Sequence, residues 1–206
     1  MKIYPITVGA LQCNNYLIAE GDRAVLIDCS GDGVQILRLA RELGVTLDAI
    51  ILTHGHADHI EAVDSVAAEF SCPVYVHNED FSFLKRADYN LSTMIYRMPL
   101  VVETDAIPFK DGEILRFGAL SFEVIHTPGH TLGSVCLRCG DVLFTGDTLF
   151  RDSIGAIFPP FGDQQLELDS IRTRLYTIEE DMVCYPGHGE QTTLDHEKKN
   201  NEYCRL

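Results

Sequence analysis

Thr53-His54-Gly55-His56-Ala57-Asp58-His59 follows directly after the apolar segment Ala49–Leu52, which has the composition of a buried strand. Neutral imidazoles and a carboxylate are the donors that zinc and similar divalent ions prefer. A loop that leaves a buried strand can direct His54 and His56 to one side, while Asp58 and His59 turn toward a second ion as a helix begins. With 8 His in 206 residues, a chance match to this pattern has a probability on the order of one in a thousand. The pattern therefore predicts a metal site rather than a solvated histidine-rich loop.

Three further candidate ligands stand at loop positions after predicted strands. His130 and His188 each follow a Pro-Gly pair, and such a tight turn can direct an imidazole away from the sheet. Asp147 follows the apolar segment Val142–Thr145, and its two oxygens can bridge two cations. The same arrangement, a strand and then a turn and then a ligand, recurs in all of them. The sequence therefore predicts seven metal ligands: His54, His56, Asp58, His59, His130, Asp147 and His188.

The remaining histidines are weaker candidates. His77 and His126 end predicted strands, where packing or a supporting role is expected rather than ligation. His196 lies in the polar C-terminal segment and is expected to be exposed. Asp28 ends another predicted strand, where it could orient a ligand histidine from behind or could serve an ordinary turn or helix entry.

The bulk composition is that of a folded globular protein with an acidic surface. Apolar residues make up 46% and charged residues 23% of the chain. Because 16 basic and 31 acidic side chains leave a formal charge of −15, we expect no nucleic-acid partner and no anionic membrane. No signal-peptide run and no stretch of about 18 apolar residues occurs. We expect a cytoplasmic protein that acts on a small-molecule substrate; its oligomeric state is not indicated.

The seven cysteines are scattered and odd in number, which favours reduced, buried thiols. Cys136 and Cys139 have the spacing of a zinc or redox pair. However, they lie in a predicted strand, where positions three apart face opposite ways. We therefore expect no function for this pair.

The order of predicted elements indicates one domain over residues 1–206 with an α/β (α+β) fold. Strands are expected at 3–8, 16–19, 24–28, 49–53, 73–77, 114–117, 121–126, 134–138, 142–145 and 182–185. Helices are expected after an Asp32 N-cap as far as Gly44, over 60–70, and around Leu168–Ile178, with 79–108 irregular. Two mixed sheets with helices on their outer faces would satisfy this order.

At these motifs the chain resembles the metallo-β-lactamase fold superfamily, and within it the hydroxyacylglutathione hydrolases (glyoxalase II) and their single-domain relatives. The resemblance rests on the histidine loop, on His126-Thr-Pro-Gly-His130, on Gly146-Asp147-Thr148 and on Tyr185-Pro-Gly-His188. It implies a four-layer αβ/βα sandwich with two metal ions at one edge. Zinc is the first choice, with iron or manganese as alternatives.

The resemblance also implies a role for each candidate ligand. The first ion would be held by His54, His56 and His130, the second by Asp58, His59 and His188, with Asp147 as the bridge. Asn90-Leu91-Ser92 is similar to a stretch near the active site of these thioesterases.

Three departures weaken the expectation of glutathione as the thiol. After Ser153-Ile154-Gly155, the Arg and Thr-Asp of the family are replaced by Ala156-Ile157-Phe158. The terminal Asn-Pro of the relatives is Asn201-Glu202. The sequence also stops soon after Tyr203, without the helical domain that grips glutathione in two-domain glyoxalase II. None of these changes affects a candidate ligand.

The expected chemistry is hydrolysis of a small acyl thioester such as S-lactoylglutathione. Two cations that share a water molecule lower its pKa from about 15.7 toward about 7, which gives a metal-bound hydroxide at neutral pH. Asp58 would be the catalytic residue, because it would both ligate and orient that hydroxide. A thiolate leaves without much help from a general acid, since a thiol has a pKa of only about 8.5. The alternatives are a mono-iron persulfide dioxygenase, a lactonase or a β-lactamase of the same fold, or a metal-binding scaffold without activity.

Overall fold

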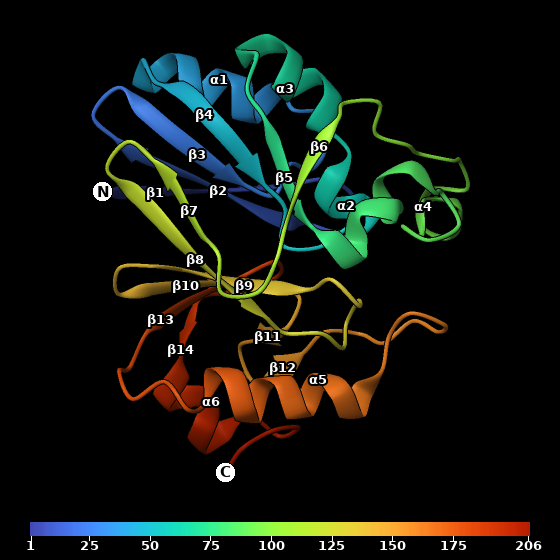
Figure 1. Ribbon diagram of the computed structural model, residues 1–206, viewed down its shortest axis with the longest axis vertical. Helices are drawn as coiled ribbons and strands as arrows, with labels where there is room; N and C mark the ends of the chain where they lie inside the picture. Colours follow the sequence, from blue (N-terminus) through green and yellow to red (C-terminus); the bar gives the residue numbers. More distant parts are fainter.

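The computed structural model describes residues 1–206 as two six-stranded sheets that pack face to face, with helices on both outer faces (Figure 1). The first sheet contains, in spatial order, β1 (Lys2–Val8), β2 (Cys13–Glu20), β3 (Arg23–Ile27), β4 (Thr46–Ile51), β5 (Val74–His77) and β6 (Ala106–Phe109). The second contains β14 (Thr192–Thr193), β13 (Val183–Pro186), β10 (Val142–Gly146), β9 (Val135–Cys139), β8 (Leu120–His126) and β7 (Ile114–Phe117). Both sheets mix parallel and antiparallel pairs, as the sequence predicts.

The helices form the two outer layers. In Figure 1, α1 (Val34–Leu43) and α3 (Val63–Phe70) cover the first sheet, while α5 (Gln164–Ser170) and α6 (Leu194–Asn200) cover the second. The short elements that complete the chain are α2 (Ala57–Ile60), the 3-10 helix η1 (Asn78–Lys85), α4 (Ser92–Tyr96), the hairpin β11 (Leu149–Phe150) and β12 (Ser153–Ile154), and the π-helical turn η2 (Ile171–Leu175). The four-layer αβ/βα sandwich is therefore confirmed.

Three apolar clusters separate these four layers. The middle cluster lies between the sheets and includes Ile18 and Val25 from the first and Phe122 and Phe144 from the second. Full burial of each such side chain stabilises the fold by about 1.5–3 kcal/mol. The other two clusters lie between each sheet and its own helices. Strand β2 is buried over almost its whole length, and its stretch Tyr16–Ala19 is continuously apolar rather than alternating because both of its faces are covered.

Helix α1 ends where the sequence predicts but begins one residue later than expected. Gly44 adopts a left-handed conformation with φ 67°, and its N–H donates to the carbonyls of Ala40 and Arg41. The N-cap is Gly33 instead of Asp32. The Asp32 carboxylate still accepts a hydrogen bond from the N–H of Val34, at 3.1 Å.

The helix expected over 60–70 is divided into α2 and α3, and the backbone of Cys29 explains the division. Its N–H donates to the His59 carbonyl at 2.9 Å, and its carbonyl accepts from the Ala62 N–H at 2.9 Å. These bonds replace the helical ladder between the two segments. The histidine loop is thus tied to the end of β3 by main-chain bonds.

The prediction that 79–108 is irregular was wrong in part, because the segment contains η1, α4 and the strand β6. Strand β6 reads Ala-Ile-Pro-Phe, without the alternation of a half-buried strand. It lies at the edge of the first sheet, which is where a proline is tolerated in a strand.

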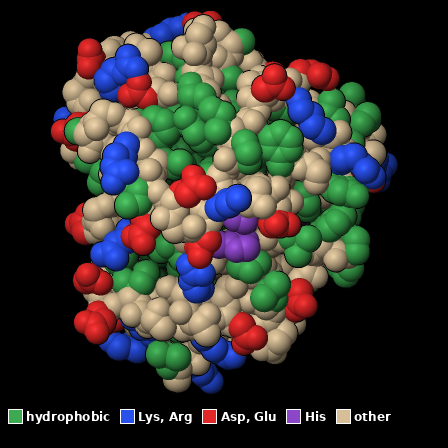
Figure 2. Space-filling model, viewed as in Figure 1, with side chains coloured by type: hydrophobic (Ala, Val, Ile, Leu, Met, Phe, Trp, Pro, Cys, Tyr) green, Lys and Arg blue, Asp and Glu red, His purple; other side chains and the backbone are tan.

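All seven cysteines are buried and none forms a disulfide. Cys136 packs among the residues under the C-terminal helices, whereas Cys139 packs between the sheets. The two thiols therefore face opposite ways, as predicted. No helix of the structure has the length and apolar character needed to span a membrane. On the face in Figure 2, Lys and Arg side chains are scattered among Asp and Glu rather than gathered into a patch.

Candidate metal centre

The seven predicted ligands come together at one edge of the sandwich. Five of them lie in loops that follow strands: His54 and His56 after β4, His130 after β8, Asp147 after β10 and His188 after β13. Asp58 and His59 lie in the short helix α2, which begins directly after His56. Six of the seven side chains are buried and that of His188 is half-buried. In Figure 1 this edge is the right-hand one, where α2 and α4 lie.

The imidazoles of His54, His56 and His130 form one converging group. His130 Nε2 lies 2.8 Å from His56 Nδ1 and 3.2 Å from His54 Nε2. Zn–N bonds of about 2.0–2.1 Å in a tetrahedral site separate the nitrogens by about 3.3 Å, so the spacing fits a shared ion. His130 Nδ1 donates to the Ala156 carbonyl at 2.9 Å, which leaves Nε2 with its lone pair.

Burial lowers the pKa of all three imidazoles, and neighbouring histidines lower it further for His54 and His56. Each ring is therefore neutral at pH 7, which is the state that ligates a metal.

A second group consists of Asp58, His59 and His188. Asp58 Oδ2 lies 3.2 Å from His188 Nε2 and 3.8 Å from His59 Nε2. The other ring nitrogen of each histidine has a hydrogen-bond acceptor: His188 Nδ1 donates to the Leu11 carbonyl at 3.1 Å, and His59 Nδ1 donates to Asp28 Oδ2 at 2.8 Å. Both rings are thereby oriented with Nε2 toward the carboxylates.

Asp147 lies between the two groups. Its Oδ2 is 3.6 Å from His130 Nε2 and 3.5 Å from His188 Nε2. Its Oδ1 is buried without a hydrogen-bond partner, although His59 Nε2 lies 3.3 Å away. Burial alone would raise the pKa of Asp147, but His59 and the other imidazoles hold it well below its usual range. An unpaired buried carboxylate oxygen among imidazoles fits a bridge between two divalent ions.

Asp28 supports both groups from behind the histidine loop. Besides its bond to His59, it accepts hydrogen bonds from the Thr53 N–H at 2.8 Å and from Thr53 Oγ1 at 2.9 Å. Thr53 Oγ1 in turn lies 3.2 Å from His54 Nδ1. Of the two roles open to Asp28 from the sequence, the structure places it in contact with a candidate ligand, His59. Its positive φ of 58° shows that it also makes the turn at the end of β3.

Asp80 is a supporting residue that sequence reasoning missed. Its Oδ2 accepts from the Gly55 N–H at 2.8 Å and from Thr131 Oγ1 at 2.7 Å, and its Oδ1 accepts from the Gly133 N–H at 2.7 Å. This fully buried carboxylate therefore joins the His54–His56 loop to the His130 loop. Burial raises its pKa to about 6, against the effect of the three hydrogen bonds. The signal that could have identified it is an acidic residue just past the end of β5, the strand beside β4.

In both Pro-Gly turns the glycine allows the tight turn and also lets neighbouring residues pack directly against its backbone. A Cβ built on Gly187 would lie 2.7 Å from His59 Cε1 and still closer to Asp147 Oδ1. A Cβ on Gly129 would collide with the backbone of Glu167. Neither position has room for a side chain.

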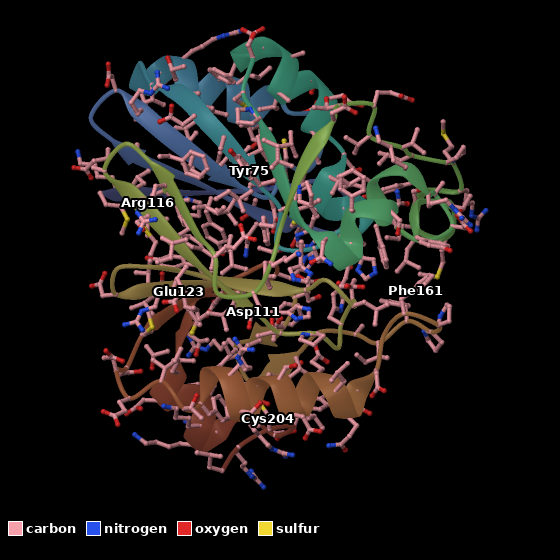
Figure 3. All side chains as sticks on the ribbon, in the orientation of Figure 1. Tyr75, Asp111, Arg116, Glu123, Phe161 and Cys204 are labelled. Atoms are coloured by element: carbon pink, nitrogen blue, oxygen red, sulfur yellow. The ribbon has the colours of Figure 1, made fainter.

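A cavity of about 290 Å³ opens onto both groups. Five of its lining residues are predicted ligands, and the other six are apolar: Leu11, Leu91, Ile95, Phe150, Ala156 and Phe158. Leu91 belongs to the Asn90-Leu91-Ser92 stretch, and its neighbour Asn90 accepts the Ala57 N–H at 2.8 Å through its carbonyl. Phe161 extends the apolar surface at the right-hand edge of Figure 3, with its ring centroid 4.4 Å from that of Tyr89.

The other histidines lie outside these groups. His77 and His126 stack on each other, with ring centroids 4.1 Å apart. His196 is half-buried rather than exposed, because its Nε2 lies 2.7 Å from Asp152 Oδ1. This contact joins α6, which carries His196, to the turn of the hairpin β11–β12, which carries Asp152.

A family model described as the metallo-beta-lactamase superfamily matches residues 8–188. Hydroxyacylglutathione hydrolase GloC of Haemophilus influenzae is 34% identical over 210 residues, which cover 98% of each chain. Among solved structures, BLEG-1 B3 metallo-beta-lactamase has a TM-score of 0.94 at 35% identity and covers 98% of this chain and 99% of its own. TTHA1623 in a di-iron-bound form has a TM-score of 0.86 at 32% identity, covering 97% and 99%.

Proposed function

The chain belongs to the metallo-beta-lactamase superfamily, and from this membership and the cavity we propose a metal-dependent hydrolase of small, largely apolar acyl thioesters. The observation that supports this substrate class best is the cavity lining. Apart from the predicted ligands, every lining side chain is apolar. The cavity therefore offers no lysine, tyrosine or serine as a general acid and no arginine or lysine as a partner for an anion.

Two divalent ions are proposed for the site. The first would be held by His54, His56 and His130, and the second by Asp58, His59 and His188, with Asp147 between them. Bound there, the ions would polarise a substrate carbonyl and make water a nucleophile at neutral pH. The di-iron form of TTHA1623 supports a site for two ions in this fold. Zinc is our proposal for this chain, with iron and manganese as alternatives.

Asp58 is the proposed catalytic residue. Its carboxylate lines the cavity, so it can accept a hydrogen bond from a water molecule and orient it toward a carbonyl carbon. Burial alone would raise its pKa, but His59 and His188 lower it below the usual range. Asp58 is therefore ionised at neutral pH and available as an acceptor.

Because the cavity lining has no proton donor, we infer that the leaving group is one that departs without protonation. An alkoxide leaving group needs a general acid, whereas a thiolate, with a thiol pKa of about 8.5, does not. The apolar residues around the cavity would hold the acyl or thiol portion and exclude water. Two methionines on and just after α4 are also exposed: Met94 to 57% and Met98 to 68%.

We propose that the site recognises glutathione only weakly as the thiol portion of a thioester. GloC is described as a hydroxyacylglutathione hydrolase, which supports the thioester class. However, the two glutathione carboxylates would find no cationic side chain in the cavity lining. We therefore expect S-lactoylglutathione to be cleaved with a high KM.

A second candidate is β-lactam hydrolysis, favoured by the 35% identity with BLEG-1. The leaving group of that reaction is an amine, which leaves poorly unless it is protonated. The cavity lining offers no side chain for this beyond the proposed ligands and Asp58. Thioesters are therefore our first choice.

Elemental analysis and a substrate panel test the proposal together. The protein would be reconstituted with zinc, iron or manganese, and kcat/KM measured for thioesters that share one acyl group and differ in the thiol. We expect two metal equivalents and faster cleavage of apolar thioesters than of S-lactoylglutathione. Turnover of a β-lactam or a lactone but of no thioester would overturn the substrate class. Oxygen consumption with a persulfide at one iron per chain would favour a dioxygenase. If replacing glutathione by a simple thiol cuts kcat/KM a hundredfold, our prediction that glutathione is only weakly recognised is wrong.

A further inference from the structure

The cavity at the metal centre has a phenylalanine at each end. Phe158 lies against His56 of the first group, with ring centroids 6.2 Å apart and an interplanar angle of 89°. Phe150 lies against His188 of the second group, with centroids 6.0 Å apart and an angle of 88°. Both phenylalanines line the cavity. We call the two sides of the cavity the Phe158 end and the Phe150 end.

Packing and a main-chain bond hold Phe158 in place. It belongs to the loop 156–162, which follows β12. Later in this loop, the ring of Phe161 packs against those of Phe83 and Tyr89, with centroids 5.2 and 4.4 Å away. Figure 3 shows Phe161 at the right-hand edge, where the loop meets the segment that contains η1 and α4. The Phe158 carbonyl also accepts a hydrogen bond from the Gly162 N–H at 3.0 Å. The loop is therefore anchored on the first half of the chain.

The Phe150 end is more open to solvent than the Phe158 end. Leu11, in the turn between β1 and β2, is 47% exposed and lines the cavity beside His188. The side chain of His188 is 24% exposed, whereas that of His130 on the other side is only 3% exposed. A ligand too long for the cavity can therefore extend into solvent past Leu11 and His188.

The size of the cavity indicates which portion of a thioester lies at which end. At about 290 Å³, the cavity is at the lower limit of the roughly 300–1,000 Å³ of pockets that enclose a small ligand. It can hold an acyl chain with its carbonyl group, but not a peptide or nucleotide carrier as well. The carrier must therefore reach solvent, which it can do at the Phe150 end. The acyl chain then lies at the Phe158 end.

We propose that Phe158 is a specificity-determining residue that limits the length of the acyl chain. The proposal rests on the proposed function, because it assigns the two portions of a thioester to the two ends of the cavity. While added methylene groups are buried, each is worth about a fourfold gain in kcat/KM. A chain that reaches the Phe158 ring gains nothing more, because the anchored loop keeps the ring from moving aside.

Thioesters of one small thiol, N-acetylcysteamine, with straight acyl chains from acetyl to decanoyl test this limit in the zinc-loaded protein. In the parent we expect kcat/KM to rise with chain length, reach a maximum and then fall. Phe158→Ala should move the maximum to longer chains and raise the decanoyl-to-butanoyl ratio at least tenfold, which corresponds to about two more buried methylene groups. Phe150→Ala, the matched control at the other end, should change this ratio less than threefold.

The affinity for uncleavable ketones is a second readout that needs no turnover. In these ketones a methylene group replaces the thioester sulfur, and their binding would be measured by isothermal titration calorimetry. We expect the same maximum of affinity with chain length, and the same shift in Phe158→Ala. If Phe158→Ala does not fold, Phe158→Leu replaces it, because leucine keeps an apolar side chain in the loop. It should shift the maximum in the same direction by a smaller amount.

An acyl-chain profile that is the same in the parent and in the Phe158 variants would overturn the proposal, although the thioester class would stand. A shift in Phe150→Ala instead would place the acyl chain at the Phe150 end and would overturn it as well. If no thioester turns over, the proposed function fails, but the ketones still test Phe158. A shift of their chain-length maximum in Phe158→Ala would then support the limit, and an unchanged maximum would refute it.

Discussion

Gly187→Ala should disable the site through a single added methyl group. The backbone of Gly187 is not in the left-handed region, so alanine adds no conformational strain. The Cβ would lie 2.7 Å from His59 Cε1, whereas ordinary contacts begin at 3.4 Å. His59 would have to move by about 0.7 Å, and Asp147, whose Oδ1 is closer still, by more.

Both side chains that must move are proposed ligands. A misplacement of about 1 Å in a catalytic group can lower the rate by about a hundredfold, or about 2.7 kcal/mol. We expect Gly187→Ala to lose about this much in kcat/KM on the best thioester and to bind the second metal equivalent at least tenfold more weakly. Isothermal titration of metal-free protein and steady-state kinetics would measure the two effects separately.

Gly189→Ala, two residues further on, is the matched control. Gly189 has φ +77° and nothing within 4 Å of a built Cβ. Alanine there suffers the left-handed penalty of about 1–2 kcal/mol without a collision. We expect a lower thermal midpoint with normal metal binding. If Gly187→Ala binds two equivalents normally and stays within threefold of the parent kcat/KM, or if both variants fail alike, steric exclusion at Gly187 is not what preserves the site.

Three further predictions test the catalytic residue, the loop junction and a buried histidine. Asp58→Ala should abolish hydrolysis while circular dichroism shows an intact fold, because the side chain lines the cavity rather than the apolar core; activity within tenfold of the parent would count against a catalytic role. Asp80→Asn should lower the free energy of unfolding of metal-free protein by about 1–3 kcal/mol, measured in urea. The amide would face at least one buried N–H with another donor, so an unchanged midpoint would contradict this. Burial lowers the pKa of His77 to about 4, so the folded chain keeps the ring neutral while the unfolded chain protonates it below about pH 6.5. Its contribution is complete above about pH 6.5 and is lost as the pH falls toward 4, by about 3 kcal/mol. His77→Asn, which keeps an acceptor for the Glu79 N–H, should flatten that part of the stability profile measured in metal-free protein.

The positions of the seven candidate ligands could be predicted because each depends on local sequence. A strand followed by a tight turn places a side chain at a sheet edge whatever the rest of the chain does. That these edges coincide follows from the packing of the two sheets. The structure brings the seven side chains together, and their assignment to two ions stays a prediction.

Asp80 could not be found in this way, because its role depends on contacts distant in sequence. Asp80 lies in a 3-10 helix with no recognisable periodicity, and its partners Thr131 and Gly133 are some fifty residues away. The break between α2 and α3 has a similar origin, since the bonds that cause it come from Cys29.

The chain passes from the first sheet to the second only once, over Lys110–Glu113 between β6 and β7. Each half therefore comprises a sheet with its own helices, and neither half has a complete set of donors. His54 and His56 lie in the first half, whereas His130, the third member of their group, lies in the second. Asp58 and His59 likewise lie in the first half and His188 in the second. Cleavage in the segment 110–113 would give two fragments of similar size that share one apolar interface and two split groups of candidate ligands. If these groups hold the proposed ions, added metal would tighten the association of the fragments, so their reassembly would report on metal binding.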